Sequence, residues 1–382
     1  MAETSPLSIT LPPLRITLNN EKQVNLEWLM QNLPLLENGK NGDANPPKKP
    51  ELPTETRRWI ATNKLLNVAD DDIIKALEPT GCDMQLVREE LSLIYSHPYY
   101  QSGNEFFQLL KKLESHYTIA DQLASLSPKY GSIERRSSIS RDFFLENYYS
   151  KNTPVIITNI MDDWDALRLW TTDHLKEKYG HAPVQIQANR NSDPEYEINV
   201  EKHRKDVTFS EYIDLITQVG ETNDYYMVAN NHTLEKEEFK GLLKDFTIFP
   251  EYLDPNNYHA RMFFWFGPAG TVTPLHHDPV NIFLAQVKGR KLVKLIPTNQ
   301  TPLMYNHVGV FSKVDMDNPD YDKYPLFRKV KIIETILEPG EVLFLPVGWW
   351  HYVRSLDISI SVSFTNFVFP NYYEWNYPHI GR

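Results

Sequence analysis

Two histidines and an aspartate in the C-terminal half of the chain have the residue types and the spacing of a metal site. His276 and Asp278 stand two residues apart in TPLHHDPV, so both side chains point to one face if this segment is a β-strand. His351 follows Asp278 by 351 − 278 = 73 residues and opens a further strand. Two imidazoles and one carboxylate leave three positions open on an octahedral ion, as in non-haem Fe(II) oxygenases.

Each part of this set also has a plainer interpretation. A His-x-Asp pair often occurs by chance, and His277 could replace His276, although it would point to the opposite strand face from Asp278. His351 lies in the aromatic stretch WWHY and, taken alone, is equally well explained as a packed core histidine. The ordered combination favours the metal site.

Lys291 is the next residue that could do chemistry. It lies 291 − 276 = 15 residues after His276, beyond a tight turn, and shares one strand face with Val293 and Leu295. A lysine on an inward apolar face is costly unless it meets an anion. The distal carboxylate of 2-oxoglutarate is such an anion, and Thr273 could donate its hydroxyl to the same group. A solvated lysine in a basic hairpin tip is the alternative.

Short alternating strands must position these residues. Beyond Gly180 the sequence is dominated by such segments, separated by Gly, Pro and Asn: PVQIQ, DYYMVAN, ARMFFWFG, NIFLAQV, RKLVKLIP, VKIIETILE, EVLFLP, HYVRSL and ISISVSFTNF. Many short strands at near-even spacing predict a β-sandwich or a barrel.

Three segments are expected along the chain. Residues 1–54 are rich in Pro, Asn and charge and predict a flexible N-terminal arm. Residues 55–130 carry apolar residues at three- and four-residue spacings and predict a small helical module. Residues 131–382 would then form the main, mostly β domain.

Composition limits the partners. The chain has 39 basic and 50 acidic side chains, a net charge of −11, which disfavours nucleic acid. No signal peptide is recognisable, and no stretch approaches the roughly 18 apolar residues of a membrane span, so no membrane partner is expected. The only cysteine, Cys82, cannot form an internal disulfide. A reducing, cytoplasmic location is therefore expected.

From Glu134 to Pro370 the sequence resembles the cupin-like, JmjC-type Fe(II)- and 2-oxoglutarate-dependent oxygenases. The resemblance rests on NTPVIITNIMDDWDAL, FGPAGTVTPLHHDPVNIFLAQVKGRKLVKLIP and EPGEVLFLPVGWWHYVRSLDISISVSF, and covers roughly two thirds of the chain. The pattern is similar to the asparaginyl hydroxylase of hypoxia-inducible factor and to the small JmjC arginyl hydroxylases. It implies a mainly β fold with helical additions, in which a jelly-roll (double-stranded β-helix) barrel follows a small helical module.

The resemblance also implies roles for individual residues. His276, Asp278 and His351 would bind Fe(II). Lys291 would pair with the C5 carboxylate of 2-oxoglutarate, with Thr273 assisting.

Three further cosubstrate residues follow from the same resemblance. Tyr226, in DYYMVAN, matches a tyrosine that binds the same carboxylate, and Tyr225 is its register-shifted competitor. Ser363, on the last strand, matches a polar position near the cosubstrate. Relatives commonly have an asparagine where this chain has Ile282; Asn281, one residue earlier, either substitutes for it or the contact is lost.

The activity implied is oxidation of a substrate C–H bond with Fe(II), O2 and 2-oxoglutarate, releasing succinate and CO2. A protein or peptide substrate is expected over a small molecule, and side-chain hydroxylation over histone demethylation, because no zinc cluster accompanies the barrel. The acidic loop at residues 315–325 and the aromatic residues around His351 could wall a peptide site or be solvated loop and core. A homodimer is compatible with the resemblance. Two rival classes remain: a catalytically inert cupin-like binding module, and a cupin with a different activity, such as an isomerase or a dioxygenase that needs no cosubstrate.

Overall fold

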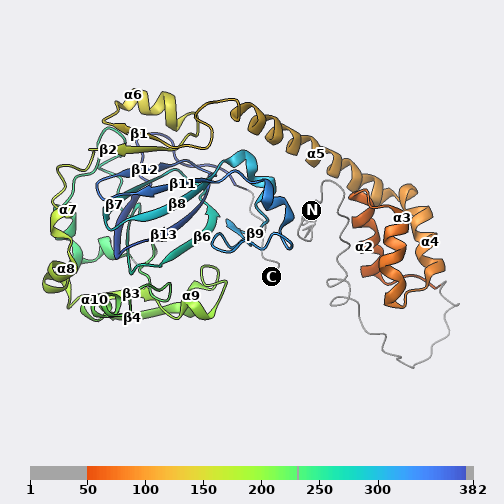
Figure 1. The fold of residues 1–382 in the computed structure, drawn as a ribbon, viewed down its shortest axis with the longest axis horizontal. Helices are drawn as coiled ribbons and strands as arrows, with labels where there is room; N and C mark the ends of the chain where they lie inside the picture. Colours follow the sequence, from red (N-terminus) through yellow and green to blue (C-terminus); the bar gives the residue numbers. More distant parts are fainter. Residues whose placement is uncertain (1–49, 230–231, 376–382) are drawn as a thin grey trace, which may run out of the picture. The chain divides into compact units, whose positions relative to one another are not determined.

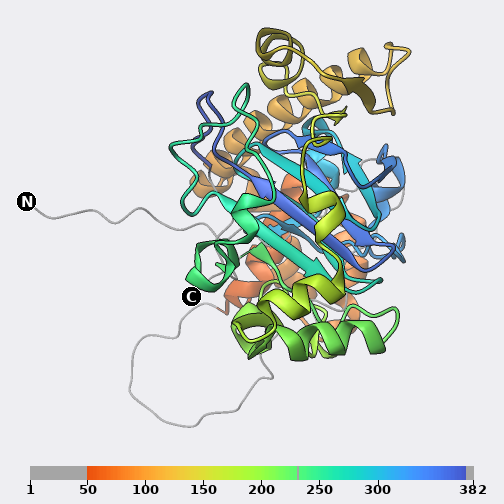
Figure 2. The same cartoon turned by 90° about the vertical axis from the view of Figure 1, so that its left-hand side faces the viewer.

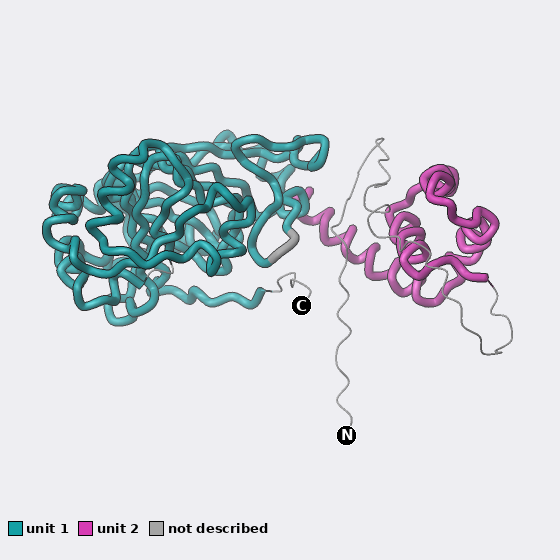
Figure 3. Tube along the Cα trace, turned by 90° about the horizontal axis from the view of Figure 1, so that it is seen from below, with its two compact units in different colours: residues 1–13, 121–382 teal, residues 14–120 magenta. Residues whose placement is uncertain are grey.

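A computed structural model describes residues 50–229 and 232–375 of the chain (Figure 1). Most of the predicted flexible arm, residues 1–49, lies outside the described residues. The described chain forms two compact units, which divide between Ala120 and Asp121 (Figure 3). No helix among the described residues is long and apolar enough to cross a bilayer.

The helical unit is unit 2 in Figure 3. Its helices are α2 (Thr54–Leu65), α3 (Asp70–Leu77), α4 (Met84–Leu93) and α5 (Pro98–Ala124), and the division between the units falls within α5. Helix α3 opens with three aspartates, whose charges favour a helix N-terminus, and the Asp83 carboxylate caps α4. The first three helices surround a small apolar core that includes Trp59, Ile73 and Leu91.

The other unit, unit 1 in Figure 3, contains a barrel made of two six-stranded sheets. The first sheet has the order β1 (Glu134–Ser137), β2 (Val155–Thr158), β12 (Val342–Leu345), β7 (Ile282–Lys288), β14 (Ser359–Phe364) and β5 (Met262–Gly267). The second has the order β11 (Ile333–Leu337), β8 (Lys291–Ile296), β13 (Trp350–Ser355), β6 (Val272–His277), β10 (Phe311–Ser312) and β9 (Asn306–Val308). The predicted mainly β, jelly-roll fold with an N-terminal helical module is confirmed.

Strand alternation separates the inside of the barrel from its outer core. On β7, Phe283, Ala285 and Val287 belong to the large aromatic core on the outer face of the first sheet, whereas Leu284 faces an inner cluster with Val293 and other aliphatic residues.

Helices complete this outer core. They are α6 (Arg141–Phe144), α7 (Ala166–Leu169), α8 (Thr172–Tyr179) and α10 (Phe209–Gln218). A further short helix is α9 (Val200–His203). Helices α8 and α10 pack together on one side of the barrel (Figures 1 and 2). Their buried residues, which include Leu175 and Phe209, join the same core.

One predicted strand is wrong. The segment DYYMVAN forms no strand in its described part; Tyr226 and Met227 each make a single bridge, to Gln187 and Phe266 respectively. These partners belong to different sheets, because Gln187 ends β3 (Pro183–Gln187), which pairs with β4 (Arg204–Thr208), and Phe266 lies on β5. The segment therefore connects two sheet edges and does not extend either of them.

We expect Phe144→Ala to destabilise the barrel unit by about 3–5 kcal/mol, the usual cost of removing a buried aromatic ring. Phe144 is fully buried and contacts the rings of several aromatic residues, including Tyr252, Phe283 and Phe344. The matched control is Phe143→Ala, because the neighbouring ring is 41% exposed. Urea unfolding of both variants measures the difference, and equal losses would contradict this account of the core.

Candidate functional site

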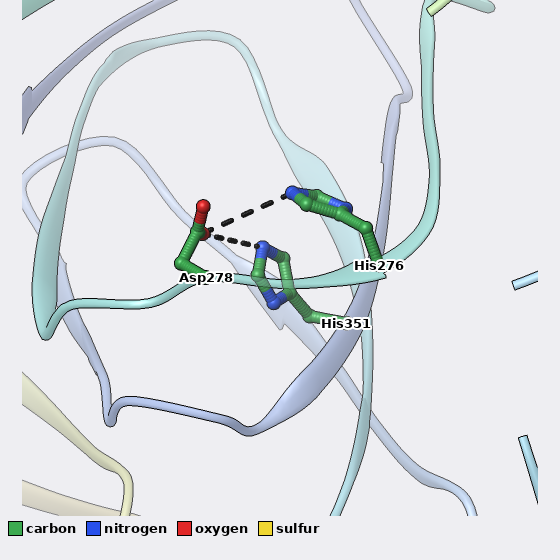
Figure 4. A group of neighbouring side chains, drawn as sticks. All are labelled: His276, Asp278 and His351. Carbon is green, nitrogen blue, oxygen red and sulfur yellow. Dashed lines mark ion pairs between the residues drawn. The ribbon is translucent and has the colours of Figure 1, made fainter. Parts of the chain in front are cut away.

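The antiparallel pairing of β6 with β13 brings the two histidines together. His276 lies directly opposite His351 in this register, and their ring centroids are 4.1 Å apart. The Asp278 carboxylate faces both imidazoles, with Oδ2 3.3 Å from His351 Nε2 and 3.8 Å from His276 Nε2 (Figure 4). One donor atom from each residue lies within 4.8 Å of the others, so the three predicted ligands form one cluster.

Backbone contacts orient both imidazoles for metal binding. His276 Nδ1 lies 2.8 Å from the carbonyl of Pro274, and His351 Nδ1 lies 3.0 Å from that of Trp349. A carbonyl only accepts, so each Nδ1 carries the proton and each Nε2 offers its lone pair toward Asp278. Burial, and then the nearby His351, lower the pKa of His276 to about 4, which keeps its Nε2 unprotonated at neutral pH.

Asp278 lies one residue beyond the end of β6, so the strand alternation used to predict the His-x-Asp pair does not extend to it. Its carbonyl accepts from Gly348 N–H, which ties the turn after β6 to the turn before β13. The His277 ring instead contacts Trp350 and Trp375. The alternative in which His277 replaces His276 is therefore wrong.

Lys291 lies on the inner face of β8 and is 2% exposed, beside the fully buried Val293 and Leu295. The alternative of a solvated lysine in the hairpin tip is therefore wrong. Its Nζ lies 3.4 Å from Tyr226 Oη, and burial lowers the pKa of Lys291 to about 7. Among the described residues no carboxylate pairs with it, so this ammonium group suits an incoming anion.

Tyr226, rather than Tyr225, is the tyrosine that reaches Lys291. Its side chain is buried and is influenced by the Thr273 side chain, while Tyr225 packs against the outer core. Burial raises the pKa of Tyr226, with the Arg190 charge and the Thr273 contact opposing that rise. Lys291, Tyr226 and Thr273 thus form one polar group.

The other two predicted cosubstrate residues have different surroundings. Ser363 accepts a hydrogen bond of 2.8 Å from the indole of Trp265, whose ring lies 5.9 Å from that of Tyr226. The Asn281 amide is engaged at both ends: its oxygen accepts from Val347 N–H and its nitrogen donates to Tyr373 Oη. These contacts join Asn281 to the C-terminal segment, and its role toward the cosubstrate stays a prediction.

Sequence reasoning missed two residues that contact this group. Arg190 is fully buried and its guanidinium lies over the Tyr226 ring, and Trp265 links Tyr226 to Ser363. Arg190 comes from a loop rich in Asn, Asp and Pro, where no strand or helix periodicity indicates burial. Trp265 sits at an alternating position of a predicted strand, which is the one signal that could have placed it inside the barrel.

A cavity of about 870 Å³ adjoins the metal site, with Pro274 and Phe311 in its wall. The Phe311 ring stacks on His276 at 5.7 Å. Six acidic and three basic residues line the cavity: Asp193, Glu195, Glu197, Glu221, Asp315, Asp317, Lys313, Lys323 and Arg354. The acidic loop at 315–325 therefore contributes to the cavity wall.

The aromatic residues around His351 are all buried. Tyr352 and Trp350 belong to one apolar cluster and Trp349 to another, and Tyr352 also lines the cavity. Only one of these rings can therefore meet a molecule in the cavity.

Residues 140–367 match the model of the cupin-like domain. This chain belongs to the cupin-like domain family. The predicted relationship to JmjC-type oxygenases is confirmed by the match to the cupin-like domain together with relatives that are named as lysine-specific demethylases. Members of this oxygenase family use Fe(II) and 2-oxoglutarate.

Three relatives illustrate the range of the family. "Lysine-specific demethylase JMJ30" of Arabidopsis thaliana is 36% identical over 243 residues, 61% of this chain and 54% of that protein. "Lysine-specific demethylase 8" of Xenopus tropicalis is 34% identical over 59% of this chain and 50% of its own length. "tRNA wybutosine-synthesizing protein 5" of Gallus gallus is 28% identical over 59% of this chain and 74% of its own length. The chain spans about half the length of the two demethylases.

The donor set fits the family's metal and cosubstrate. Two neutral imidazole nitrogens and one carboxylate suit Fe(II), and a buried ammonium group beside a tyrosine suits the distal carboxylate of 2-oxoglutarate. His276, Asp278 and His351 would hold the metal, and Lys291, Tyr226 and Thr273 would hold the far end of the cosubstrate.

We expect 2-oxoglutarate affinity to fall about tenfold between pH 6 and pH 8. Lys291 must be protonated to pair with a carboxylate, and its pKa of about 7 leaves it mostly neutral at pH 8 in the free protein. Binding must then take up nearly one proton. Calorimetry with Mn(II) in place of Fe(II), in buffers of different ionisation enthalpy, measures both quantities.

Lys291→Met should weaken binding and remove its pH dependence. Lys294→Met is the matched control, because this neighbour on the opposite strand face bonds instead to the carbonyl of Met316. Equal pH dependence in wild type and Lys291→Met would show that another group takes up the proton.

Proposed function

We propose that this chain is an Fe(II)- and 2-oxoglutarate-dependent oxygenase that hydroxylates a side chain of a protein or peptide. The substrate C–H bond becomes C–OH, one atom of O2 enters the product, and 2-oxoglutarate takes up the other as it forms succinate and CO2. The observation that carries the proposal is the convergence of His276, Asp278 and His351 in a barrel whose inner face also holds Lys291, a buried cation that no carboxylate among the described residues neutralises.

The bound metal and cosubstrate supply the oxidising chemistry, and the protein supplies position and surroundings. His276 and His351 present fixed Nε2 atoms because backbone carbonyls hold their Nδ1 protons. Lys291 and Tyr226 neutralise and orient the far carboxylate of 2-oxoglutarate from inside the barrel. The inner aliphatic cluster, which includes Val353 on the same strand as His351, keeps water from one side of the site.

The acidic cavity supports a cationic protein segment as substrate. Carboxylates outnumber cations six to three in its wall, and the whole chain carries a net charge of −11. Three of the acids are paired with arginines: Glu221 and Asp317 with Arg354, and Glu197 with Arg190. Glu195 and Asp315 are exposed and form no ion pair with another described residue. Such a surface favours lysine or arginine and disfavours a polyanion such as tRNA, the molecule in the name of one relative.

Cellular location and assembly remain proposals of the same kind. A cytoplasmic location rests on the single cysteine, Cys82, which is free. The homodimer stays a prediction that no observation on the described residues tests.

The enzyme class is tested by succinate release from 2-oxoglutarate under air with added Fe(II). We expect turnover by the wild type and loss of at least about tenfold in Asp278→Ala, because two imidazoles alone hold Fe(II) poorly. His277→Gln is the control, since this adjacent ring contacts two tryptophans rather than the metal cluster. No succinate and no metal-dependent 2-oxoglutarate binding by the wild type would leave the inert cupin-like module as the better account.

Substrate class is tested with peptides that carry arginine, lysine or N-methyl-lysine, compared with matched peptides that carry citrulline or norleucine. We expect a 16 Da gain on the cationic peptides only. Release of formaldehyde from N-methyl-lysine would instead indicate demethylation, the activity in the names of two relatives.

The same peptides test the cavity wall. Glu195→Gln and Asp315→Asn should each raise the KM for cationic peptides by up to about fivefold, the usual worth of an exposed charge pair. Asp322→Asn is the matched control, because Asp322 lies in the same loop but outside the cavity and pairs with Arg328. Unchanged KM values in all three variants would show that these acids do not contact the substrate.

A further inference from the structure

Arg190 is a fully buried cation outside the metal cluster, and its contacts link three segments of the barrel unit. One nitrogen donates to the Glu197 carboxylate at 2.6 Å and to the Val272 carbonyl at 2.9 Å. The other donates to the side-chain oxygen of Asn223 at 2.9 Å. A buried guanidinium needs such partners, because an uncompensated charge in the interior is strongly destabilising.

The guanidinium also packs against two tyrosine rings. Its central carbon lies 4.2 Å from the centroid of Tyr196 and 5.3 Å from that of Tyr226. The hydroxyl of Tyr226 lies 3.4 Å from Lys291 Nζ. Tyr226 therefore contacts Arg190 through its ring and Lys291 through its hydroxyl. Arginine over an aromatic face is attractive, and its planar head restricts how the ring can tilt.

The contacts of Arg190 also hold the start of β6. Val272, whose carbonyl accepts from Arg190, donates its own N–H to the same Asn223 oxygen at 2.8 Å. The next residue is Thr273, whose side chain acts on Tyr226 and opposes the rise of its pKa. One guanidinium therefore restrains the Tyr226 ring directly and the Thr273 hydroxyl through its neighbour in the chain.

We propose that Arg190 is a positioning residue for 2-oxoglutarate. It holds Tyr226 and Thr273 in the arrangement that, with Lys291, receives the distal carboxylate. This inference rests on the proposed function, because it takes these three side chains as the cosubstrate site. Arg190 itself reaches the cosubstrate only through Tyr226 and Thr273.

The test is the affinity of the full chain for 2-oxoglutarate, measured by calorimetry with Mn(II) in place of Fe(II). Lys in place of Arg keeps the charge but cannot bond to Glu197, Asn223 and Val272 together. Arg190→Lys should therefore weaken 2-oxoglutarate binding about tenfold, which corresponds to about 1.4 kcal/mol. Binding of Mn(II) alone, followed by the EPR signal of the free ion, should change by less than about twofold. Arg204→Lys, on an exposed salt bridge with Glu201, is the matched control.

A double-mutant cycle with Tyr226→Phe separates positioning from general damage to the fold. If Arg190 acts through the Tyr226 hydroxyl, Arg190→Lys should add much less than tenfold in the Tyr226→Phe background. Full additivity, or equal loss of Mn(II) binding, would overturn the inference. If Arg190→Lys does not fold, Glu197→Gln is used in the same cycle, since it leaves the arginine in place but removes its counter-charge.

The outcomes also separate this inference from the proposed function. Normal 2-oxoglutarate binding by the Tyr226→Phe variant would contradict the assignment of the cosubstrate site itself. Weaker binding in Tyr226→Phe with unchanged binding in Arg190→Lys would overturn the role of Arg190 alone.

Discussion

The register between β6 and β13 determines the chemistry of the site. His276 stands opposite His351, but the pairing then slips, so that Val353 stands opposite Thr273. Pro274 and Leu275 of β6 thus stand opposite Tyr352 of β13 alone, which is a β-bulge. Strand alternation alone would put Thr273 on the face opposite His276. The bulge reverses that alternation, so a metal ligand and a residue that acts on Tyr226 come from the same inner face.

The barrel unit buries two cations, Arg190 and Lys291, which differ in whether a carboxylate neutralises them. Arg190 is neutralised by Glu197, whose pKa is raised by burial although Arg190 opposes that rise. Lys291 has no such carboxylate among the described residues, and burial lowers its pKa accordingly. Placing an unpaired cation there costs stability at neutral pH, and this cost is offset when an anion binds. The asymmetry between the two buried cations marks one as structural and the other as a binding group.

Sequence reasoning succeeded where a residue's face follows from local alternation. Lys291, Val293 and Leu295 occupy one face of β8 as expected, and the two histidines come from neighbouring strands. It failed where geometry depends on irregular backbone. The position of Asp278 beyond the strand end and the single bridges around Tyr226 have no periodic signal.

Long-range side-chain contacts were also beyond the reach of sequence reasoning, for a related physical reason. Asn281 stands one residue before the family position, and its amide bonds to Val347 N–H and the Tyr373 hydroxyl. Arg190 is buried because its partners converge from three segments, and none of these contacts leaves a local pattern. A buried polar group must satisfy its hydrogen bonds wherever the fold offers partners, so its role depends on tertiary structure. The candidate metal ligands could be predicted because the types and spacing of so few residues already restrict their chemistry, whereas the positions of the residues proposed to orient the cosubstrate are determined by packing.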